Sequence, residues 1–374
     1  MNIPIDIPQH QLTEYLYNKA SRARIPLSGT FELSPVCNFD CRMCYVRKTA
    51  KEVREHDRPI LQLEDWLRIA REAKEQGMLY LLLTGGEPFL WPDFWTLYDE
   101  LIDMGMLISI NTNGSLIDDA AIEHLRRKPP RRISITLYGA SDETYRQLCG
   151  AKDVFAKVDR AIRGLKEAGI AVRVNCSLTP QNAGDADAVI AYTARNELPL
   201  SIATYMFPPI RRNENMVGIN ERFTPQEAAE HRMRCYRLQY GEEMYRNYLA
   251  DIRDGSIDPP GLDEDCLDPV DGKIRCRAGK STFWITWDGW MTPCGMIPEP
   301  KVDLMQSDFS GAWRKLVALS DEMLLSGVCD KCPNNKICHP CAAMAVAETG
   351  SHAGIPRYLC QMTQRMRQIA ESGE

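Results

Sequence analysis

Short β-rich runs alternate with amphipathic helical stretches between residues 61 and 205, and this alternation constrains the fold more than any other feature of the chain. The apolar runs cover 29–34, 79–84, 107–111, 132–137, 171–178 and 201–205. The helical stretches cover 63–76, 94–104, 118–127, 153–168 and 185–195. Repeated strand and helix units form parallel sheets, so we predict an α/β fold with a partial (β/α)6 barrel. Functional residues should then gather at the carboxyl ends of the strands.

The composition changes after about residue 208. Residues 224–253 look helical, and 254–271 are rich in Gly, Pro and Asp, as expected for a linker or an irregular loop. Eight cysteines follow between Cys266 and Cys360, among apolar residues that are too scattered for a conventional small core. We therefore expect three parts, which are an N-terminal extension (1–27), a barrel core with following helices (28–259) and a cysteine-rich domain (260–374).

The fourteen cysteines among 374 residues need a chemical role, since they are too sparse for a disulfide scaffold. The N-terminus lacks the apolar core of a signal peptide, and no later stretch reaches a membrane-spanning length. We therefore expect a cytoplasmic protein without a membrane partner, in which clustered cysteines bind metal or take part in catalysis. The net charge of -6 argues against nucleic acid as a partner.

Cys37, Cys41 and Cys44 form a C-x3-C-x2-C motif just past the first predicted strand. Thiolates bind iron-sulfur clusters well, and three of them leave one iron of a four-iron cluster free to bind a small molecule. The alternatives are a zinc site that lacks a ligand, or three unrelated cysteines.

This motif, read as CNFDCRMCY, is followed by Gly85-Gly86-Glu87-Pro88 at the end of the second predicted strand. Together they resemble the radical S-adenosylmethionine (radical SAM) superfamily over roughly residues 28–205. The resemblance implies that the open iron chelates S-adenosylmethionine. It also implies that Gly85 and Gly86 permit close backbone approach and that Glu87 accepts a hydrogen bond from the amino group of the cofactor. Less specific cofactor positions are Tyr45, Asn113, Thr136 and Leu178.

Three of those less specific positions have ordinary structural explanations. Asn-Gly also forms common turns, Thr is frequent in strands and Leu is usually a core residue. We keep both interpretations open for Asn113, Thr136 and Leu178.

A second set of cysteines resembles the SPASM module, which houses auxiliary 4Fe–4S clusters and is shared by peptide- and sulfatase-modifying enzymes. The set comprises Cys276, Cys294, Cys329, Cys332, Cys338, Cys341 and Cys360. One departure is that two residues separate Cys338 from Cys341, where the family usually has three. Two structural zinc sites would use the same ligands and remain the alternative.

The resemblance also implies how these thiols are shared, giving three 4Fe–4S clusters in all. It assigns the distal cluster to Cys329, Cys332, Cys338 and Cys360. It assigns the proximal cluster to Cys276, Cys294 and Cys341, with Cys266 as the candidate fourth ligand. Without Cys266, the open iron could bind a substrate thiol.

Three cysteines and one loop have no assignment. Cys149, Cys176 and Cys235 are either buried small residues or a thiol hydrogen-atom donor, which an epimerase would need. The segment 204–212 (TYMFPPIRR) follows the last predicted strand at the barrel mouth. It either positions substrate or forms a Pro-bounded turn.

The leading hypothesis is an enzyme that uses a 5′-deoxyadenosyl radical to modify a ribosomally synthesised peptide oxidatively, by crosslink or thioether formation. Alternatives are a formylglycine-forming sulfatase-maturing type, a small-molecule radical dehydrogenase or heme- or quinone-pathway enzyme, a peptide epimerase, and a non-enzymatic iron-sulfur or zinc protein. Only 36 residues precede Cys37, so a precursor peptide could require a separate leader-binding protein. A low-potential electron donor such as flavodoxin or ferredoxin is also expected, and the sequence singles out no catalytic acid or base.

Overall fold

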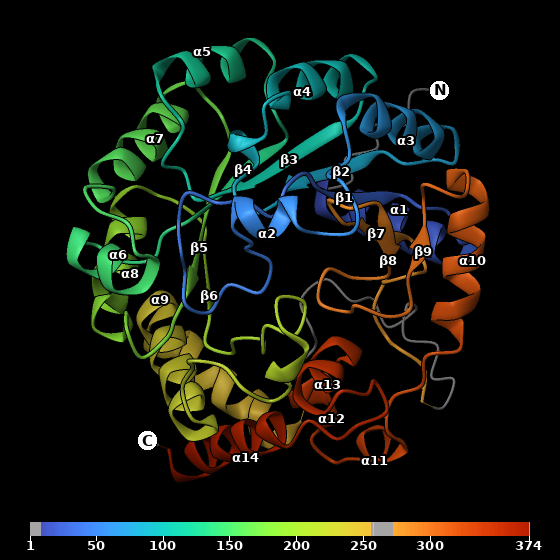
Figure 1. The fold of residues 1–374 in the computed structure, drawn as a ribbon. Helices are drawn as coiled ribbons and strands as arrows, with labels where there is room; N and C mark the ends of the chain where they lie inside the picture. Colours follow the sequence, from blue (N-terminus) through green and yellow to red (C-terminus); the bar gives the residue numbers. More distant parts are fainter. Residues whose placement is uncertain (1–8, 256, 258–271, 374) are drawn as a thin grey trace, which may run out of the picture.

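Six parallel strands curve into an open barrel at the centre of the molecule (Figure 1). The computed structural model describes residues 9–255, 257 and 272–373. The strands are β1 (Ser28–Glu32), β2 (Tyr80–Thr84), β3 (Leu107–Thr112), β4 (Arg132–Thr136), β5 (Val172–Ser177) and β6 (Leu200–Ala203). Consecutive strands are neighbours throughout, in the order β6-β5-β4-β3-β2-β1. The predicted partial barrel of parallel strands is confirmed.

Helices cover the outer face of this sheet (Figure 1). They include α3 (Leu63–Glu75), α4 (Phe94–Asp103), α5 (Asp119–Arg127), α7 (Phe155–Glu167) and α8 (Ala186–Arg195). On α3, the buried side chains are Trp66, Ile69, Ala70 and Ala73, three or four residues apart along one face. This spacing is the pattern that predicted the helices, because it allows an apolar stripe to pack on the sheet while the other face meets water.

The sequence analysis did not anticipate three further helices. These are α1 (Gln9–Ala23), α2 (Ala50–Arg54) and α6 (Asp142–Cys149). The α6 helix begins at Ser141, whose hydroxyl accepts a hydrogen bond from the Thr144 backbone N–H, and ends at Gly150 with a φ of 62°. Short 3₁₀ turns lie at Pro88–Leu90, Ala183–Asp185 and Glu214–Met216.

Three strands of the cysteine-rich region extend the same sheet. They are β7 (Thr282–Ile285), β8 (Trp290–Thr292) and β9 (Val302–Asp303). The β7 strand pairs in parallel with β1, and β8 and β9 add antiparallel partners, which gives a sheet of nine strands among the described residues. The cysteine-rich region is therefore joined to the barrel by backbone hydrogen bonds.

The remaining helices close the structure around the open side of the barrel (Figure 1). They are α9 (Pro225–Asp254), α10 (Phe309–Asp321), α11 (Gly327–Asp330), α12 (Asn335–Cys338), α13 (Ala342–Thr349) and α14 (Arg357–Ser372). The α9 helix is kinked at Gly241, where φ is 80°, and α14 packs along it. The predicted domain boundary near residue 260 lies outside the described residues.

A small apolar core does form in the cysteine-rich region, although the sequence suggested that the apolar residues were too scattered. Its buried members are Ile274, Ala278, Ile297, Met323, Leu325, Ala342 and Ala343. They come from separate loops and from α13, so no local periodicity could reveal them. Within the described residues, no helix is both long and apolar enough to cross a membrane.

Candidate functional site

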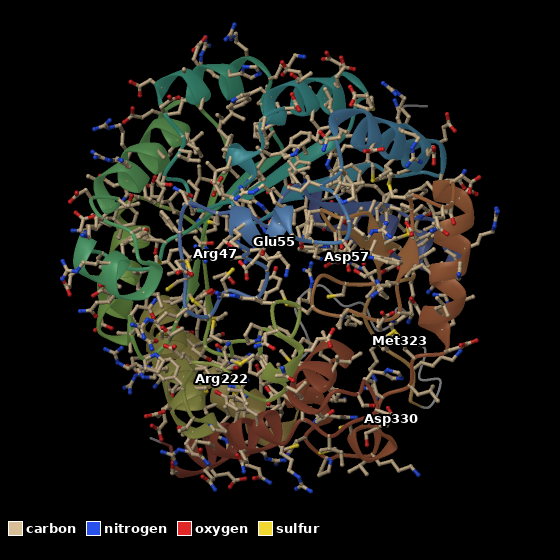
Figure 2. All side chains as sticks on the ribbon, in the orientation of Figure 1. Arg47, Glu55, Asp57, Arg222, Met323 and Asp330 are labelled. Atoms are coloured by element: carbon tan, nitrogen blue, oxygen red, sulfur yellow. The ribbon has the colours of Figure 1, made fainter. Side chains whose placement is uncertain are left out.

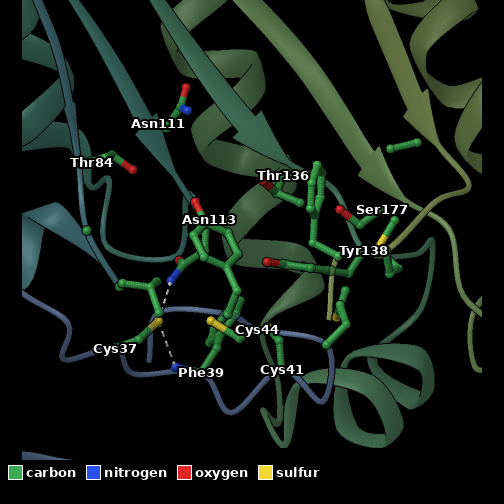
Figure 3. A pocket seen from close by; sticks show the side chains of 18 of the residues that line it. Cys37, Phe39, Cys41, Cys44, Thr84, Asn111, Asn113, Thr136, Tyr138 and Ser177 are labelled. Carbon is green, nitrogen blue, oxygen red and sulfur yellow. Dashed lines mark hydrogen bonds between the residues drawn. The ribbon is translucent and has the colours of Figure 1, made fainter. Parts of the chain in front are cut away.

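A cavity of about 340 Å³ opens at the carboxyl ends of the barrel strands, where the fold predicts a site (Figure 3). The last residues of five strands contribute Thr84, Thr112, Thr136, Ser177 and Ala203 to its wall. The cysteine motif contributes Cys37, Cys41, Cys44 and Tyr45, and the end of β2 contributes Gly85 and Gly86. Residues more than 160 positions apart in the sequence thus meet in one cavity.

Gly85 and Gly86 bring the end of β2 directly against the loop that carries the cysteines. The backbone N–H of Gly86 donates to the Ser34 carbonyl at 2.7 Å, and that of Glu87 donates to the Val36 carbonyl at 3.0 Å. A Cβ atom on Gly86 would lie 2.4 Å from the Val36 oxygen, well inside van der Waals contact. In this structure the close approach that glycine permits is therefore between two backbone segments, and it fixes the start of the cysteine loop.

The Glu87 carboxylate lies beneath the strand ends and is completely buried. It accepts hydrogen bonds from the Thr112 hydroxyl at 2.7 Å and from the Asn113 backbone N–H at 2.8 Å. Burial raises the pKa of Glu87 to about 7, and these hydrogen bonds limit the rise. The structure thus places the Glu87 carboxylate against the end of β3, and its contact with the amino group of the cofactor stays a prediction.

Asn113 connects Glu87 to the cysteine loop. Its side-chain amide donates to the Cys37 thiol at 3.8 Å (Figure 3). The same amide donates to the Asn38 side chain at 2.9 Å. Asn113 therefore stands on the cavity wall as predicted for a cofactor residue, and in addition it orients the first cysteine.

The three thiols of the motif are spaced along one loop below the strand ends (Figure 3). Burial raises the pKa of Cys37 to about 12, while the Phe39 backbone N–H donates to its sulfur at 3.3 Å and opposes that rise. The Arg47 backbone N–H likewise donates to Cys44 at 3.4 Å. Backbone N–H donors of this kind stabilise bound thiolates.

A four-iron cluster fits this donor set. Across residues 9–255, 257 and 272–373, no three or more His, Cys, Asp or Glu side chains converge as they would around a single metal ion. A cubane cluster binds each cysteine through a different iron, so it requires three thiols spread over one wall, as Cys37, Cys41 and Cys44 are.

The α6 helix, which the sequence analysis missed, holds the other side of the cysteine loop. Backbone N–H groups of Asp40 and Arg42 donate to the carbonyls of Cys149 and Leu148, at 2.7 and 3.1 Å. A hydrogen bond with Cys149 lowers the pKa of Cys41, and Tyr138 contributes in the same direction.

The remaining predicted cofactor residues separate into two groups. Tyr45 and Thr136 line the cavity. Leu178 is completely buried in the core and is not among the described lining residues, while its neighbour Ser177 is. Because successive strand side chains alternate in direction, the residue that faces the barrel interior is the one before Leu178.

Aromatic and sulfur-containing side chains without an individual assignment from the sequence also line the wall. They are Phe39, Met43, Tyr138, Tyr205, Met206, Phe207 and Met296. Three of them fall in the 204–212 segment, whose aromatic residues suggested a role at the barrel mouth. Cys149, Cys176 and Cys235 are buried elsewhere and are absent from the described wall.

The cysteines of the second region lie in two separate sets. Burial raises the pKa of Cys338 to about 11, and Cys360, Cys329 and Cys332 lie close enough to raise this pKa further. Burial also raises the pKa of Cys294 to about 11, and the thiols of Cys341 and Cys276 add to this rise. These effects place Cys338 near the other three thiols of the first set and Cys294 near Cys276 and Cys341, while their assignment to two clusters stays a prediction. Cys266 lies outside the described residues.

Two buried ion pairs hold the segment after β6, one to the end of β1 and one to α13 of the cysteine-rich region. Arg211 binds Glu32 through both guanidinium nitrogens, at 2.9 and 2.8 Å. Arg222, which is labelled in Figure 2, binds Glu348 in the same way. Glu348 also accepts a hydrogen bond from Tyr205 at 2.6 Å. The cavity wall at Tyr205 is therefore fixed from α13, seven residues after Cys341.

Comparison with known proteins agrees with this geometry. Residues 31–192 match the family model of the radical SAM superfamily. This match shows a radical SAM domain within the chain, and such a domain implies S-adenosylmethionine and one 4Fe–4S cluster as cofactors.

Longer similarities extend beyond that domain. The AdoMet-dependent heme synthase of Methanosarcina barkeri is 22% identical over 335 residues, which are 86% of this chain and 93% of the synthase. Streptococcus suis SuiB, solved with the precursor peptide SuiA, superposes with a TM-score of 0.66 at 20% identity, over 96% of this chain and 83% of SuiB. The enzyme anSMEcpe, solved with AdoMet and the Cp18Cys peptide, gives a TM-score of 0.65 at 17% identity, over 93% and 97% of the two chains. The two structural likenesses show a shared fold.

Proposed function

We propose that this radical SAM enzyme carries a SPASM module with two auxiliary 4Fe–4S clusters and oxidatively modifies a ribosomally synthesised peptide. The observation that carries the proposal is the arrangement of the described thiols. Three of them share the cavity wall, and seven more lie as a set of four and a set of three in the cysteine-rich region. A substrate that loses hydrogen must also lose an electron, and auxiliary clusters provide an acceptor for it.

The residues of the chain have distinct parts in this reaction. S-adenosylmethionine, when bound at the cluster, supplies a 5′-deoxyadenosyl radical that abstracts a hydrogen atom. Cys37, Cys41 and Cys44 would hold that cluster, and Glu87 orients the first of them through Asn113. The aromatic wall excludes water, which would otherwise quench a reactive intermediate.

Two proteins with the same fold, SuiB and anSMEcpe, were solved with bound peptides, and this supports a peptide substrate. A precursor peptide reaching the cavity would pass Tyr205 and Phe207, which line it on the open side of the barrel. A separate leader-binding protein and a low-potential reductant remain part of the proposal.

A small-molecule substrate is the second candidate. The observation in its favour is the similarity to the heme synthase, which spans nearly the whole of both chains. The epimerase alternative has less support, because Cys149, Cys176 and Cys235 do not reach the described cavity wall.

A direct test offers both substrate classes to the reconstituted enzyme without oxygen. Peptides encoded beside the gene and a heme precursor are each incubated with S-adenosylmethionine and a reductant, and the products are analysed by mass spectrometry. Loss of two hydrogens from a peptide, with matching release of 5′-deoxyadenosine, supports peptide oxidation. If only the heme precursor is converted, peptide oxidation is overturned in favour of a small-molecule substrate.

A further inference from the structure

Arg211 joins three parts of the molecule at the border between the barrel and the cysteine-rich region. Its guanidinium binds Glu32 at the end of β1, and the same group donates to the Gly295 carbonyl at 2.9 Å. The indole N–H of Trp284 on β7 donates to Glu32 at 2.9 Å. The Arg211 side chain is 12% exposed and that of Glu32 is 1% exposed, so water screens this pair weakly.

The guanidinium lies next to the backbone that carries one of the proximal thiols. Gly295, which accepts its hydrogen bond, directly follows Cys294 in the chain. The positive charge of Arg211 opposes the burial that raises the pKa of Cys294. On its other side, the guanidinium carbon lies 5.9 Å from the ring centroid of Tyr45, next to Cys44. Arg211 is thus a fixed cation between the cavity and the proximal cysteine set.

We propose that Arg211 is a positioning residue that raises the reduction potential of the proximal auxiliary cluster. This inference rests on the proposed function, since it requires that cluster to be present. One-electron reduction adds one negative charge to a cluster, and a nearby buried cation stabilises the added charge. A cluster that is easier to reduce is a better acceptor for the electron that a substrate radical must lose.

Glu32 supplies the opposite influence and makes the proposal sharply testable. Its carboxylate partly cancels the field of Arg211, so removing either charge should move the potential in opposite directions. Arg211→Gln should lower the potential and Glu32→Gln should raise it, while Arg211→Lys, which keeps the charge, should stay near the wild type. Arg24→Gln is the matched control, because it also removes an arginine that is paired with a carboxylate. Arg24 pairs with Asp321 at a site where both side chains are about one-third exposed.

The measurement is an EPR-monitored redox titration in a background with Cys37, Cys41 and Cys44 changed to Ala, which removes the first cluster. The proximal signal is identified as the one that Cys294→Ala abolishes. We expect about a tenfold change in the ratio of reduced to oxidised cluster at a fixed potential, which corresponds to about 59 mV for a one-electron couple. Iron and sulfide are assayed in every variant.

Arg211→Gln leaves Glu32 buried without its partner and could prevent folding. In that case, the double variant Glu32→Gln/Arg211→Gln is compared with Glu32→Gln, and we expect the lower potential in the double variant. The role of Arg211 would be overturned if Arg211→Gln and Glu32→Gln shifted the reduction potential in the same direction. It would also be overturned if the potential were unchanged while the cluster was present. Absence of auxiliary iron in the parent protein would instead overturn the proposed function, and this inference with it.

Discussion

The carboxylate of Glu87 accepts the backbone N–H of Asn113, whose side-chain amide donates to the thiol of Cys37. Three elements that are remote in the sequence are thereby linked in series, from the end of β2 through the end of β3 to the cysteine loop. The acidic residue of the GGEP motif is therefore bonded to the residue that donates to the first thiol. This relationship predicts measurable effects at both ends of the series.

Glu87→Gln should reduce the dependence of stability on pH. The pKa of Glu87 is raised to about 7 by burial, so the folded state binds a proton more tightly than the unfolded state does. The raised pKa of Glu87 contributes to the free energy of unfolding. This contribution is fully present below about pH 4.5 and is lost as the pH rises to about 7. Between about pH 5.5 and 7.5, the wild type should lose about 2 kcal/mol more than the variant.

Urea unfolding followed by circular dichroism measures this difference. Glu75→Gln, at an exposed position on α3, is the control for loss of a carboxylate. Equal pH slopes for wild type and Glu87→Gln would contradict the assignment of a raised pKa to Glu87.

Gly86→Ala should disrupt the cysteine loop. The added Cβ would lie 2.4 Å from the Val36 oxygen, and both atoms belong to rigid backbone. We expect a loss of about 1–3 kcal/mol in stability, together with reduced iron binding at the first cluster. Gly184→Ala is the matched control, because nothing lies within 4 Å of the position its Cβ would take. If both variants bind iron equally, the close backbone approach has no role in forming the site.

Changing Cys37, Cys41 and Cys44 together to Ala should abolish production of 5′-deoxyadenosine. The auxiliary sets are separate from these thiols, so about eight irons should remain, at four for each auxiliary cluster. Iron assay and chromatography of the nucleoside products test the two expectations independently. Retention of cofactor cleavage in this variant would disprove the location of the active site.

Breaking the buried pair of Arg222 and Glu348 should destabilise the protein strongly. Their side chains are only 6% and 7% exposed, and Glu348→Gln leaves Arg222 as an unpaired buried charge. The expected cost is about 3–5 kcal/mol, measured by chemical unfolding. Asp187→Asn breaks the solvent-exposed pair with Arg234 and should cost no more than about 1 kcal/mol. If breaking either ion pair cost a similar amount of stability, burial would not determine how much each pair contributes.

Local patterns predicted the barrel because each strand and helix buries a regular stripe. The 172–177 strand shows this plainly, with Val172, Val174 and Cys176 buried and the residues that alternate with them only partly buried. The α6 helix was missed because its eight residues include few apolar positions, and its existence depends on caps at Ser141 and Gly150. Short helices held by caps and tertiary contacts leave a weak periodic signal.

The candidate site was predictable where a motif concentrates its residues, as in the loop from Cys37 to Cys44. It was not predictable where the contacts are remote. The burial of Glu87 beneath Asn113 and the pairing of Arg211 with Glu32 depend on how strands and loops meet in space. Even with the correct strand order, alternation alone could not decide between Ser177 and Leu178 as the residue facing the cavity.

The central claim is that the chain is a three-cluster radical enzyme, and one anaerobic measurement tests it most directly. Iron and sulfide are quantified after reconstitution, and 5′-deoxyadenosine is measured after addition of dithionite and S-adenosylmethionine. The account predicts about twelve irons per chain, four for each cluster, together with cofactor cleavage. Zinc in place of iron, or bound iron without cofactor cleavage, would contradict it.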